Sequence, residues 1–328
     1  MNNRIRSRIH FLLIALPALL LASLFCPPAM AQQRNPAQLI GQTVADTGSA
    51  HYRFERFVVC SDDGLRTWRV NLGIPAGKVP KAGFPALWML DGNGALMEFD
   101  APLLEELAQT QPTVLVFVGY DNQQRIDSPA RTRDYTPSAE APDEGGAAVG
   151  GGADAFLEVL ERRIRPQVAQ RVAVDADQQA LWGHSLGGLF VLHALYTRGG
   201  AFQTYVPASP SLWWQQGMML GAPEQQFIGN NAGHRARVLM MLGGGERDRD
   251  TSKRDMNNPR VLAHLKRVSG APSDAAEQLS ARLRQVPGLN VEYHQFEGLG
   301  HGPMFRASLM RALHEITGVR DRSGEPRP

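Results

Sequence analysis

The chain has 328 residues, of which 43% are hydrophobic and 20% are charged, with 34 Lys and Arg against 32 Asp and Glu. This size and hydrophobic content are normal for a globular protein and are enough for one large α/β domain. No basic block is long enough for a nucleic-acid footprint, which argues against a nucleic-acid partner.

The first 31 residues have the features of a secretory signal peptide. Three arginines within the first eight residues precede an apolar run over residues 11–25, and the A-x-A cleavage signal Ala29-Met30-Ala31 follows. Pro17 interrupts this run, which is short for a membrane span of about 20 residues. The bulky Phe25 before Cys26 also disfavours a lipoprotein signal. We therefore predict cleavage after Ala31, no stable membrane anchor, and export to the periplasm.

Removal of residues 1–31 changes the charge and leaves one cysteine. Three arginines and no acidic residue are lost, so 31 Lys and Arg face 32 Asp and Glu and the net charge becomes −1. Cys60 then has no partner for an intramolecular disulfide, and stability must come from an ordinary core. We expect a polar leader over residues 32–50, one domain over 51–318 and a polar tail over 319–328.

Four predicted strands and one helix follow the leader. Residues 51–60 and 66–74 hold β-branched and aromatic side chains on either side of a turn, which is the pattern of a β-hairpin. Residues 84–90 and 113–119 are short, nearly continuous apolar runs, typical of strands buried on both faces of a parallel sheet. A helix over 96–108 between them completes a βαβ unit.

Residues 120–152 are polar, end in a glycine-rich patch and lack periodicity, so we predict a long loop. Strands and helices then alternate to the end of the chain without an internal repeat. This alternation predicts the α/β class, with one doubly wound, mostly parallel sheet in a single domain. The remaining predicted elements are a helix over 153–170, a strand over 178–182, a helix over 186–198, a strand over 237–242, a helical stretch over 259–284, a strand over 290–296 and a final helix near 303–316.

Gly183-His184-Ser185-Leu186-Gly187 is a G-x-S-x-G motif between a predicted strand and a predicted helix. A nucleophile on such a sharp turn needs a strained backbone, and flanking glycines remove side chains that would clash there. The turn lifts the Ser185 hydroxyl out of the sheet, and the amide of Leu186 can help to bind a developing oxyanion. The alternative is a helix N-cap serine after a glycine turn. The strand and helix around the motif favour the nucleophile.

A serine hydroxyl needs a base, and in this arrangement the chain order is Ser, acid, His. His301 follows a predicted strand and lies between Gly300 and Gly302, which suits a loop that places an imidazole beside the nucleophile. The alternative is an exposed loop histidine. The other downstream histidines lie in predicted helices (His193, His264, His314), in a strand (His294) or in a polar loop (His234).

The acid should follow the strand over 237–242, where Glu246 and Asp248 are the candidates after three glycines. We prefer Glu246, because a carboxylate there can accept the second imidazole proton and hold the base in its useful tautomer. Either residue could instead be a solvated loop charge. The second oxyanion donor should be a backbone amide of Asp91-Gly92-Asn93-Gly94, although D-G-N-G is also an ordinary turn.

Together these motifs resemble the Putative esterase branch of the α/β-hydrolases, which includes enterochelin esterases, and most of all its periplasmic siderophore esterases. The resemblance implies a three-layer α/β-hydrolase fold. The matching segments span nearly the whole mature chain in the same order. They are Leu90-Asp91-Gly92-Asn93, Arg131-Thr132-Arg133-Asp134-Tyr135-Thr136-Pro137, Gly183-His184-Ser185-Leu186-Gly187-Gly188, Ser209-Pro210-Ser211-Leu212-Trp213-Trp214, Gly245-Glu246 and Gly300-His301-Gly302.

The resemblance also implies a serine esterase that opens a catecholate trilactone siderophore such as enterobactin, to release iron or recycle the ligand. Ser185 would be the nucleophile, His301 the general base and then acid, and Glu246 the acid partner. Amides of Asn93 and Leu186 would form the oxyanion hole. A ferric tris-catecholate is bulky, aromatic and anionic, so it suits arginines beside aromatic walls. The expected substrate-binding residues are Asp91, Arg125, Arg131, Arg133, Tyr135, Trp213 and Trp214, unless they are solvated loop charges and core side chains.

No histidines or cysteines cluster at the spacing of metal ligands, so we expect no metal site and no cofactor. Any iron would arrive with the substrate, and we expect no obligate protein partner. Two other functions are compatible with the same chain: a general exported carboxylesterase acting on short acyl or aryl esters, and a non-catalytic periplasmic protein that binds ferric siderophore. Ser185 and His301 in their motifs argue against the second.

Overall fold

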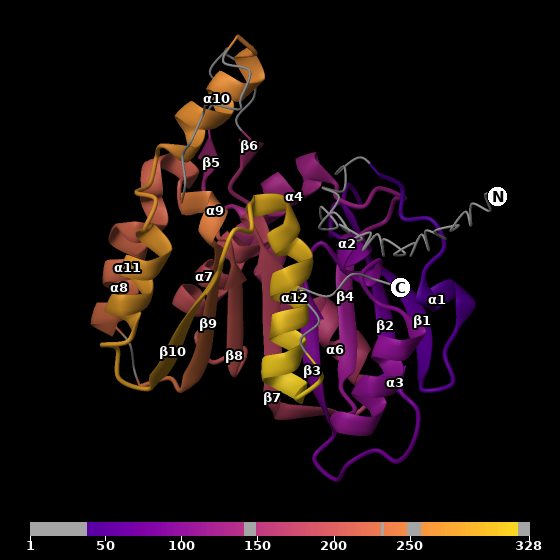
Figure 1. Cartoon of the computed structure of the whole chain (residues 1–328). Helices are drawn as coiled ribbons and strands as arrows, with labels where there is room; N and C mark the ends of the chain where they lie inside the picture. Colours follow the sequence, from indigo (N-terminus) through magenta and orange to yellow (C-terminus); the bar gives the residue numbers. More distant parts are fainter. Residues whose placement is uncertain (1–37, 141–148, 231–232, 248–256, 321–328) are drawn as a thin grey trace, which may run out of the picture. The chain divides into compact units, whose positions relative to one another are not determined.

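The computed structural model describes residues 38–140, 149–230, 233–247 and 257–320 (Figure 1). The predicted signal peptide, the start of the leader, the alternative acid Asp248 and residues 321–328 lie outside the described residues. In the described part of the chain, no helix is both long enough and apolar enough to cross a membrane.

An eight-stranded sheet forms the centre of the fold, in the order β1-β2-β4-β3-β7-β8-β9-β10. Its strands are β1 (Tyr52–Cys60), β2 (Thr67–Pro75), β3 (Phe84–Met89), β4 (Val114–Tyr120), β7 (Val174–His184), β8 (Thr204–Ala208), β9 (Ala236–Gly243) and β10 (Leu289–Phe296). β1 and β2 form the predicted hairpin, and β2 pairs antiparallel with β4. The neighbours from β4 to β10 are parallel, which confirms a mostly parallel sheet.

The strand sequences explain where each strand lies in the sheet. β3 and β4 are buried along their whole length, as expected of continuous apolar runs covered on both faces. β1 lies at one edge, where buried Phe57 and Val59 alternate with exposed residues. The winding reverses between β3 and β7, and ligands of open α/β sheets bind at the carboxyl ends of the strands at such a point. Asp91 follows β3 closely there, and Ser185 follows β7.

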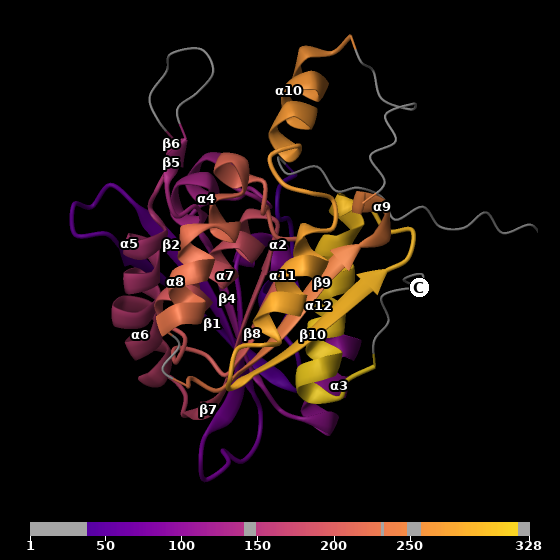
Figure 2. The ribbon, with the colours of Figure 1, turned by 90° about the vertical axis from the view of Figure 1, so that its left-hand side faces the viewer.

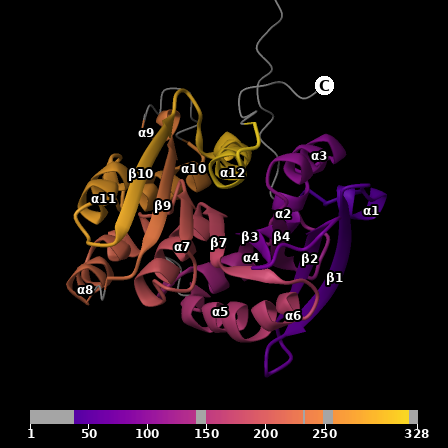
Figure 3. The ribbon, with the colours of Figure 1, turned by 90° about the horizontal axis from the view of Figure 1, so that it is seen from below.

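Helices cover both faces of the sheet, which confirms the three layers of an α/β-hydrolase (Figure 3). They are α1 (Val44–Thr47), α2 (Gly92–Leu96), α3 (Ala101–Thr110), α4 (Ser128–Tyr135), α5 (Ala153–Val159), α6 (Arg165–Ala169), α7 (Leu186–Thr197), α8 (Ala222–Asn230), α9 (Gly244–Arg247), α10 (Pro259–Val268), α11 (Ala275–Leu283) and α12 (His301–Thr317). α3 and α12 bury Leu104 and Leu309 in the core of one face. On the other face α5, α7 and α11 bury Phe156, Phe190 and Leu279.

Several elements differ from the prediction. The expected loop over 120–152 contains α4 and two short antiparallel strands, β5 (Ala139–Glu140) and β6 (Val149–Gly150). β8 and α8 were not predicted, and the predicted helical stretch over 259–284 is divided into two helices, α10 and α11. A π-helical turn (Leu160–Ile164) joins α5 to α6, so the predicted helix over 153–170 is interrupted but present. The leader contains α1, whose Val44 is buried in the core, so the folded domain begins before residue 51.

Elements from distant parts of the chain meet at the carboxyl end of the parallel strands. Figures 1 and 2 both show α10, β5 and β6 at this end, above the start of α12, with α9 at the height of its first turn. A 3-10 segment, η2 (Trp214–Leu220), also lies in this region, because the Trp214 indole donates a hydrogen bond to the carbonyl of Ser138, 3.1 Å away. The strand ends are therefore surrounded by segments that can shape a site.

Candidate active site

Ser185 lies on a sharp turn between β7 and α7. Its φ of 63° and ψ of −117° are rare for a residue with a side chain, and such strain is tolerated only where the surrounding structure fixes it. The Ser185 amide donates to the carbonyl of Ala208 at 2.9 Å, and its carbonyl accepts from the amide of Leu189 at 3.0 Å. Backbone bonds on both sides of the turn therefore hold the hydroxyl at the end of the sheet.

The glycines of the turn are not equivalent. A Cβ on Gly183 would lie 2.4 Å from the carbonyl oxygen of Gly187, and a Cβ on Gly188 would lie 2.7 Å from that of Ala208. Neither distance can accommodate a side chain without a backbone shift. A Cβ on Gly187 would make only an ordinary contact of 3.6 Å with Leu90. The turn requires glycine at 183 and 188, and the last glycine of the five-residue motif is not sterically required.

His301 contacts both Ser185 and Glu246. Its Nε2 lies 3.0 Å from the Ser185 hydroxyl, and its Nδ1 lies 2.5 Å from Oε2 of Glu246. His301 is the first residue of α12 and is not in a loop, with Gly300 as the N-cap. Its side chain is 48% exposed, which leaves the imidazole open to a substrate.

Glu246 lies in α9, the short helix after β9, with its side chain 14% exposed. Oε1 accepts hydrogen bonds from the Ser209 hydroxyl at 2.5 Å and from the Gly243 amide at 3.0 Å. Burial alone would raise the pKa of Glu246, but the contact with His301 and these two donors hold it below its ordinary value. The carboxylate is ionised at neutral pH and faces Nδ1 of His301, as an orienting acid requires.

His184, immediately before the nucleophile, is a buried neighbour of His301 that we did not predict. Its Nε2 lies 3.0 Å from the carbonyl oxygen of His301, and the two rings are 4.6 Å apart at their centroids. Burial, then the proximity of His301 and Arg131, hold the pKa of His184 well below its ordinary value. A neutral imidazole therefore donates to this carbonyl and supports the first turn of α12.

Two serines of the S-P-S-L-W-W segment also belong to the site and were not predicted. Ser209 contacts Glu246, as described above, and the Ser211 hydroxyl lies 3.2 Å from the hydroxyl of Ser185. Both serines are buried. The motif was visible in the sequence, but it did not show which of its side chains contact the nucleophile and the acid.

The two expected oxyanion donors are at the starts of helices. Leu186 is the first residue of α7, and Asn93 is the second residue of α2. Amides in the first turn of a helix have no acceptor within that helix, so they can bind an anion. The Asn93 side chain is used elsewhere, because its amide nitrogen donates to the carbonyls of Tyr120 and Gln124, both at 3.0 Å. D-G-N-G is therefore the start of a helix and not an ordinary turn.

Arg131, Asp91 and Tyr135, which we expected to bind substrate, are buried against one another. Nε of Arg131 lies 2.9 Å from Oδ1 of Asp91, and Nη2 of Arg131 lies 2.9 Å from Oδ2. The guanidinium also donates to the carbonyl of His184 at 3.0 Å. The Tyr135 hydroxyl accepts from the Asp91 amide at 3.0 Å. Because all three side chains are buried, the expectation of substrate contact is corrected: they tie the ends of β3 and β7 to α4.

Arg125 and Trp214 are also internal. The Arg125 guanidinium is 4.5 Å from the centre of the Phe305 ring and 3.7 Å from the carboxylate of Glu98. Trp214 is 3% exposed. These two residues pack the structure around the site, which corrects their expected role as substrate contacts.

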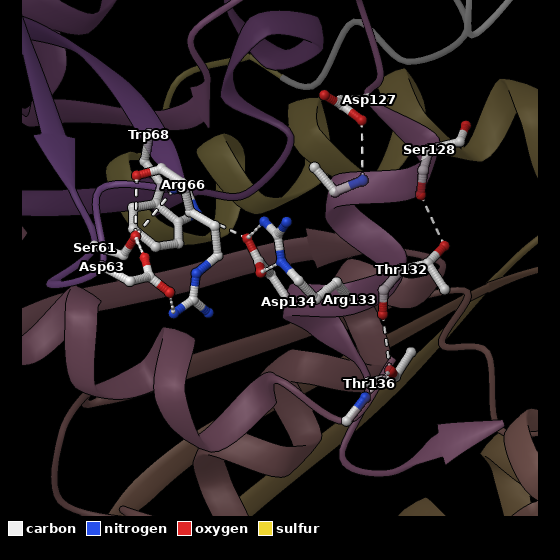
Figure 4. Close-up of polar contacts among 12 residues, drawn as sticks. Ser61, Asp63, Arg66, Trp68, Asp127, Ser128, Thr132, Arg133, Asp134 and Thr136 are labelled. Atoms are coloured by element: carbon white, nitrogen blue, oxygen red, sulfur yellow. Dashed lines mark hydrogen bonds and ion pairs between the residues drawn. The ribbon is translucent and has the colours of Figure 1, made fainter. Parts of the chain in front are cut away.

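Arg133 and Trp213 keep exposed surface. Arg133 is paired with Asp134, which also accepts a 2.7 Å hydrogen bond from the Trp68 indole, yet 38% of the Arg133 side chain is exposed (Figure 4). Trp213 is half-buried, with the guanidinium of Arg267 5.9 Å from its ring centre. These are the two predicted substrate-binding residues that a ligand could reach.

Within the described residues, no group of three or more His, Cys, Asp or Glu is placed to hold a metal ion. Ser185, Glu246 and His301 lie in the chain order Ser, acid, His. A nucleophile turn at the end of a central parallel strand, beside a histidine held by a carboxylate, defines a serine hydrolase of the α/β-hydrolase class.

Comparisons with known proteins agree with this class. The family model described as "Putative esterase" matches residues 65–316, and the chain belongs to that family. An apo-salmochelin esterase of Escherichia coli O6:H1 is 32% identical over 97% of this chain and 93% of its own length. Ferri-bacillibactin esterase BesA of Bacillus subtilis is 30% identical over 76% of this chain and 84% of its own.

Solved structures extend the likeness to three dimensions. The enterobactin hydrolase IroE in complex with DFP has a TM-score of 0.65 and 33% identity, over 84% of this chain and 99% of that one. The BES protein of Bacillus cereus also has a TM-score of 0.65, with 27% identity over 80% of this chain and 96% of that one. The chain is an esterase with the fold of these hydrolases.

Proposed function

We propose that this esterase hydrolyses the ester bonds of a catecholate trilactone siderophore, with Ser185 as nucleophile. The observation that carries the proposal is the hydrogen-bonded row from Glu246 through His301 to Ser185. The substrate class is supported by relatives whose names specify siderophore ester hydrolysis and that match across most of their length. A protein that only binds siderophores would not require these hydrogen-bonded catalytic side chains.

The row supports a two-step acyl transfer. His301 Nε2 takes the Ser185 proton as Oγ bonds to the ester carbonyl carbon, and Glu246 stabilises the imidazolium that forms. His301 then returns this proton to the leaving alkoxide, which departs as an alcohol. Water, deprotonated by His301, hydrolyses the acyl-enzyme and regenerates Ser185. Amides of Leu186 and Asn93 would stabilise the negative oxygen of both tetrahedral intermediates.

Trp213 and Arg133 are the proposed substrate contacts. A catecholate siderophore offers aromatic rings and negative charge, which an indole face and a guanidinium can bind together. Iron, when present, enters as part of the substrate. Each acyl-transfer step is carried out by protein groups and water.

We further propose that the enzyme acts in the periplasm. This rests on the basic residues, apolar run and A-x-A signal of residues 1–31, which are typical of secretory signal peptides.

The proposal is tested by giving the purified enzyme apo-enterobactin, ferric enterobactin and a short-chain nitrophenyl ester, and resolving the products by mass. Lactone opening should add one water mass per ester bond, with a higher kcat/KM for a trilactone than for the nitrophenyl ester. If the nitrophenyl ester is the better substrate and neither trilactone opens, the enzyme is a general carboxylesterase.

A further inference from the structure

The segment Ser209-Pro210-Ser211 carries two hydroxyl groups into the site from the end of β8. Ser209 has a φ of 41°, an unusual backbone for a residue with a side chain, and its amide donates to the carbonyl of Met241 at 2.7 Å. Its side chain is buried and lies 2.5 Å from Oε1 of Glu246. An ionised carboxylate has no proton, so the Ser209 hydroxyl must be the donor.

Ser211 is bound to Ser185 through both backbone and side chain. Its amide donates to the Ser185 carbonyl at 3.0 Å, and its hydroxyl lies 3.2 Å from the Ser185 hydroxyl. Ser211 is 1% exposed, so its hydroxyl is held at the nucleophile and is not a solvated group. The hydrogen bond from the Ser209 amide to the Met241 carbonyl, and packing of α7 against Pro210, where a Cβ on Gly188 would come within 3.1 Å, fix the segment in its unusual backbone conformation.

The direction of the bond between the two serines follows from counting protons. Ser185 has one hydroxyl proton, and in the reactive arrangement it points to Nε2 of His301. In the hydrogen bond between the two serines, the Ser211 hydroxyl must then be the donor and the Ser185 oxygen the acceptor. Oγ of Ser185 is consequently held by two partners, one accepting its proton and one donating to it.

We propose that Ser211 is a further catalytic residue, a hydrogen-bond donor to the nucleophile oxygen, and that Ser209 positions the acid Glu246. The inference rests on the proposed roles of Ser185, His301 and Glu246. As the Ser185 proton moves to His301, negative charge grows on Oγ until its bond to the carbonyl carbon forms, and the Ser211 donor stabilises that charge. In deacylation the same donor stabilises Oγ as its bond to the acyl carbon breaks. Ser211 keeps its own proton throughout.

The test compares Ser211→Ala and Ser209→Ala with Ser280→Ala, a control at a buried serine whose hydroxyl donates within α11, outside the site. A nitrophenyl ester gives kcat and KM, and the rate of Ser185 phosphonylation by a fluorophosphonate measures the nucleophile without an acyl substrate. Ser211→Ala should lower both kcat and the phosphonylation rate about tenfold or more, with KM within about twofold. Ser280→Ala should change neither.

Two further variants separate a donor from a space-filling side chain. Ser211→Cys keeps a weak donor of similar shape and should be faster than Ser211→Ala. Ser209→Ala should lower kcat in the wild-type background but by less than about twofold in a Glu246→Ala background, since it acts through that carboxylate. Ser211→Ala should keep its effect in that background.

The inference is overturned if Ser211→Ala retains at least half the wild-type kcat and phosphonylation rate, or if the cysteine variant is no faster than the alanine variant. An equal effect of Ser209→Ala with and without Glu246 would remove its positioning role. Because both probes are independent of siderophores, these outcomes do not depend on whether the trilactone is the substrate. Failure of that proposal would appear only in the product analysis.

Discussion

At the scale of single residues, the base of the site becomes positively charged during the reaction, and a buried, uncharged side chain lies beside it. His184 contacts His301 through its ring and donates to the His301 carbonyl at 3.0 Å. Burial, together with the proximity of His301 and Arg131, holds the pKa of His184 well below its ordinary value, so His184 is a neutral neighbour of the base. The residue before the nucleophile therefore supports the backbone of the base without adding a charge beside it.

This arrangement predicts a pH dependence of stability. In the unfolded chain His184 binds a proton near pH 6.5, but in the folded protein its pKa is well below that value, because it is buried and faces His301, Arg131 and Arg125. The unfolded state therefore binds more protons below about pH 6.5, and the free energy of unfolding falls as the pH falls from there toward the folded pKa.

The comparison uses wild type and His184→Gln, whose amide can still donate. The wild type should lose more unfolding free energy between pH 8 and pH 5.5 than the variant does, by denaturant titration at both values. The same loss in both proteins would show that His184 titrates normally in the folded state.

Sequence alone selected Ser185, His301 and Glu246 as candidates, because each follows a strand within a recognisable glycine-containing motif, and the structure brings the three side chains together. The contacts of the site residues with other side chains could not be predicted from the sequence. The bond between Ser209 and Glu246 joins residues 37 positions apart, and that between His184 and His301 joins residues 117 apart. Pairings of this kind depend on the order of strands in the sheet, which no local pattern encodes. The buried pairing of Arg131 with Asp91 was missed for the same reason.

At the scale of elements, α4 shows how a structured segment can look like a loop. Its eight residues include Arg131 and Arg133 and have little apolar periodicity, a pattern that is also typical of a polar loop. The available signal was local: Asp127 accepts from the Ala130 amide as an N-cap, with Pro129 in the first turn. Figure 4 shows this cap and, at the other end of the helix, the Thr136 hydroxyl accepting from a backbone amide.

The pair between Arg131 in α4 and Asp91 after β3 should be important for stability. Asp91→Asn leaves the Arg131 guanidinium buried without its ionised partner, which should lower the unfolding free energy by about 3–5 kcal/mol. The control is Glu158→Gln, which removes an ion pair to Arg162 in which both side chains are mostly exposed and should cost less than about 1 kcal/mol. Urea unfolding measures both, and equal costs would contradict the structural role of Asp91.

The turn between β7 and α7 gives a second prediction about an element. Gly183→Ala places a Cβ 2.4 Å from the Gly187 carbonyl oxygen, so it should destabilise the protein by about 1–3 kcal/mol and reduce the esterase rate. Gly187→Ala meets only ordinary contacts and should be neutral or stabilise α7 by up to about 1 kcal/mol. Thermal unfolding of the two variants tests this difference, and equal destabilisation would show that the turn is less rigid than described.

At the scale of the whole molecule, the sheet order brings the site together. Ser185 follows β7, Ser209 follows β8, Glu246 follows β9 and His301 comes after β10, and these four strands are consecutive neighbours in the sheet. The α/β class, the hairpin and the parallel sheet were predictable, because buried strands and amphipathic helices leave clear periodic patterns. β8 was missed because it is five residues long and contains a proline.

The proposed export makes a prediction for the intact chain. When the full 328-residue chain is produced in a Gram-negative host, the mature protein should be recovered from the periplasmic fraction with Gln32 at its N-terminus. N-terminal sequencing and fractionation measure this directly. Uncleaved protein retained in the cytoplasm would refute the signal-peptide assignment without affecting the esterase site.

The most direct measurement of the central claim is the rate at which Ser185→Ala opens the trilactone, compared with wild type at equal folded concentration. Removal of the nucleophile should lower kcat by at least about 10⁴-fold, with the variant as stable as wild type in thermal unfolding. A folded Ser185→Ala variant that keeps more than about a tenth of the wild-type rate would contradict the account, because the ester bond would then be attacked by another group.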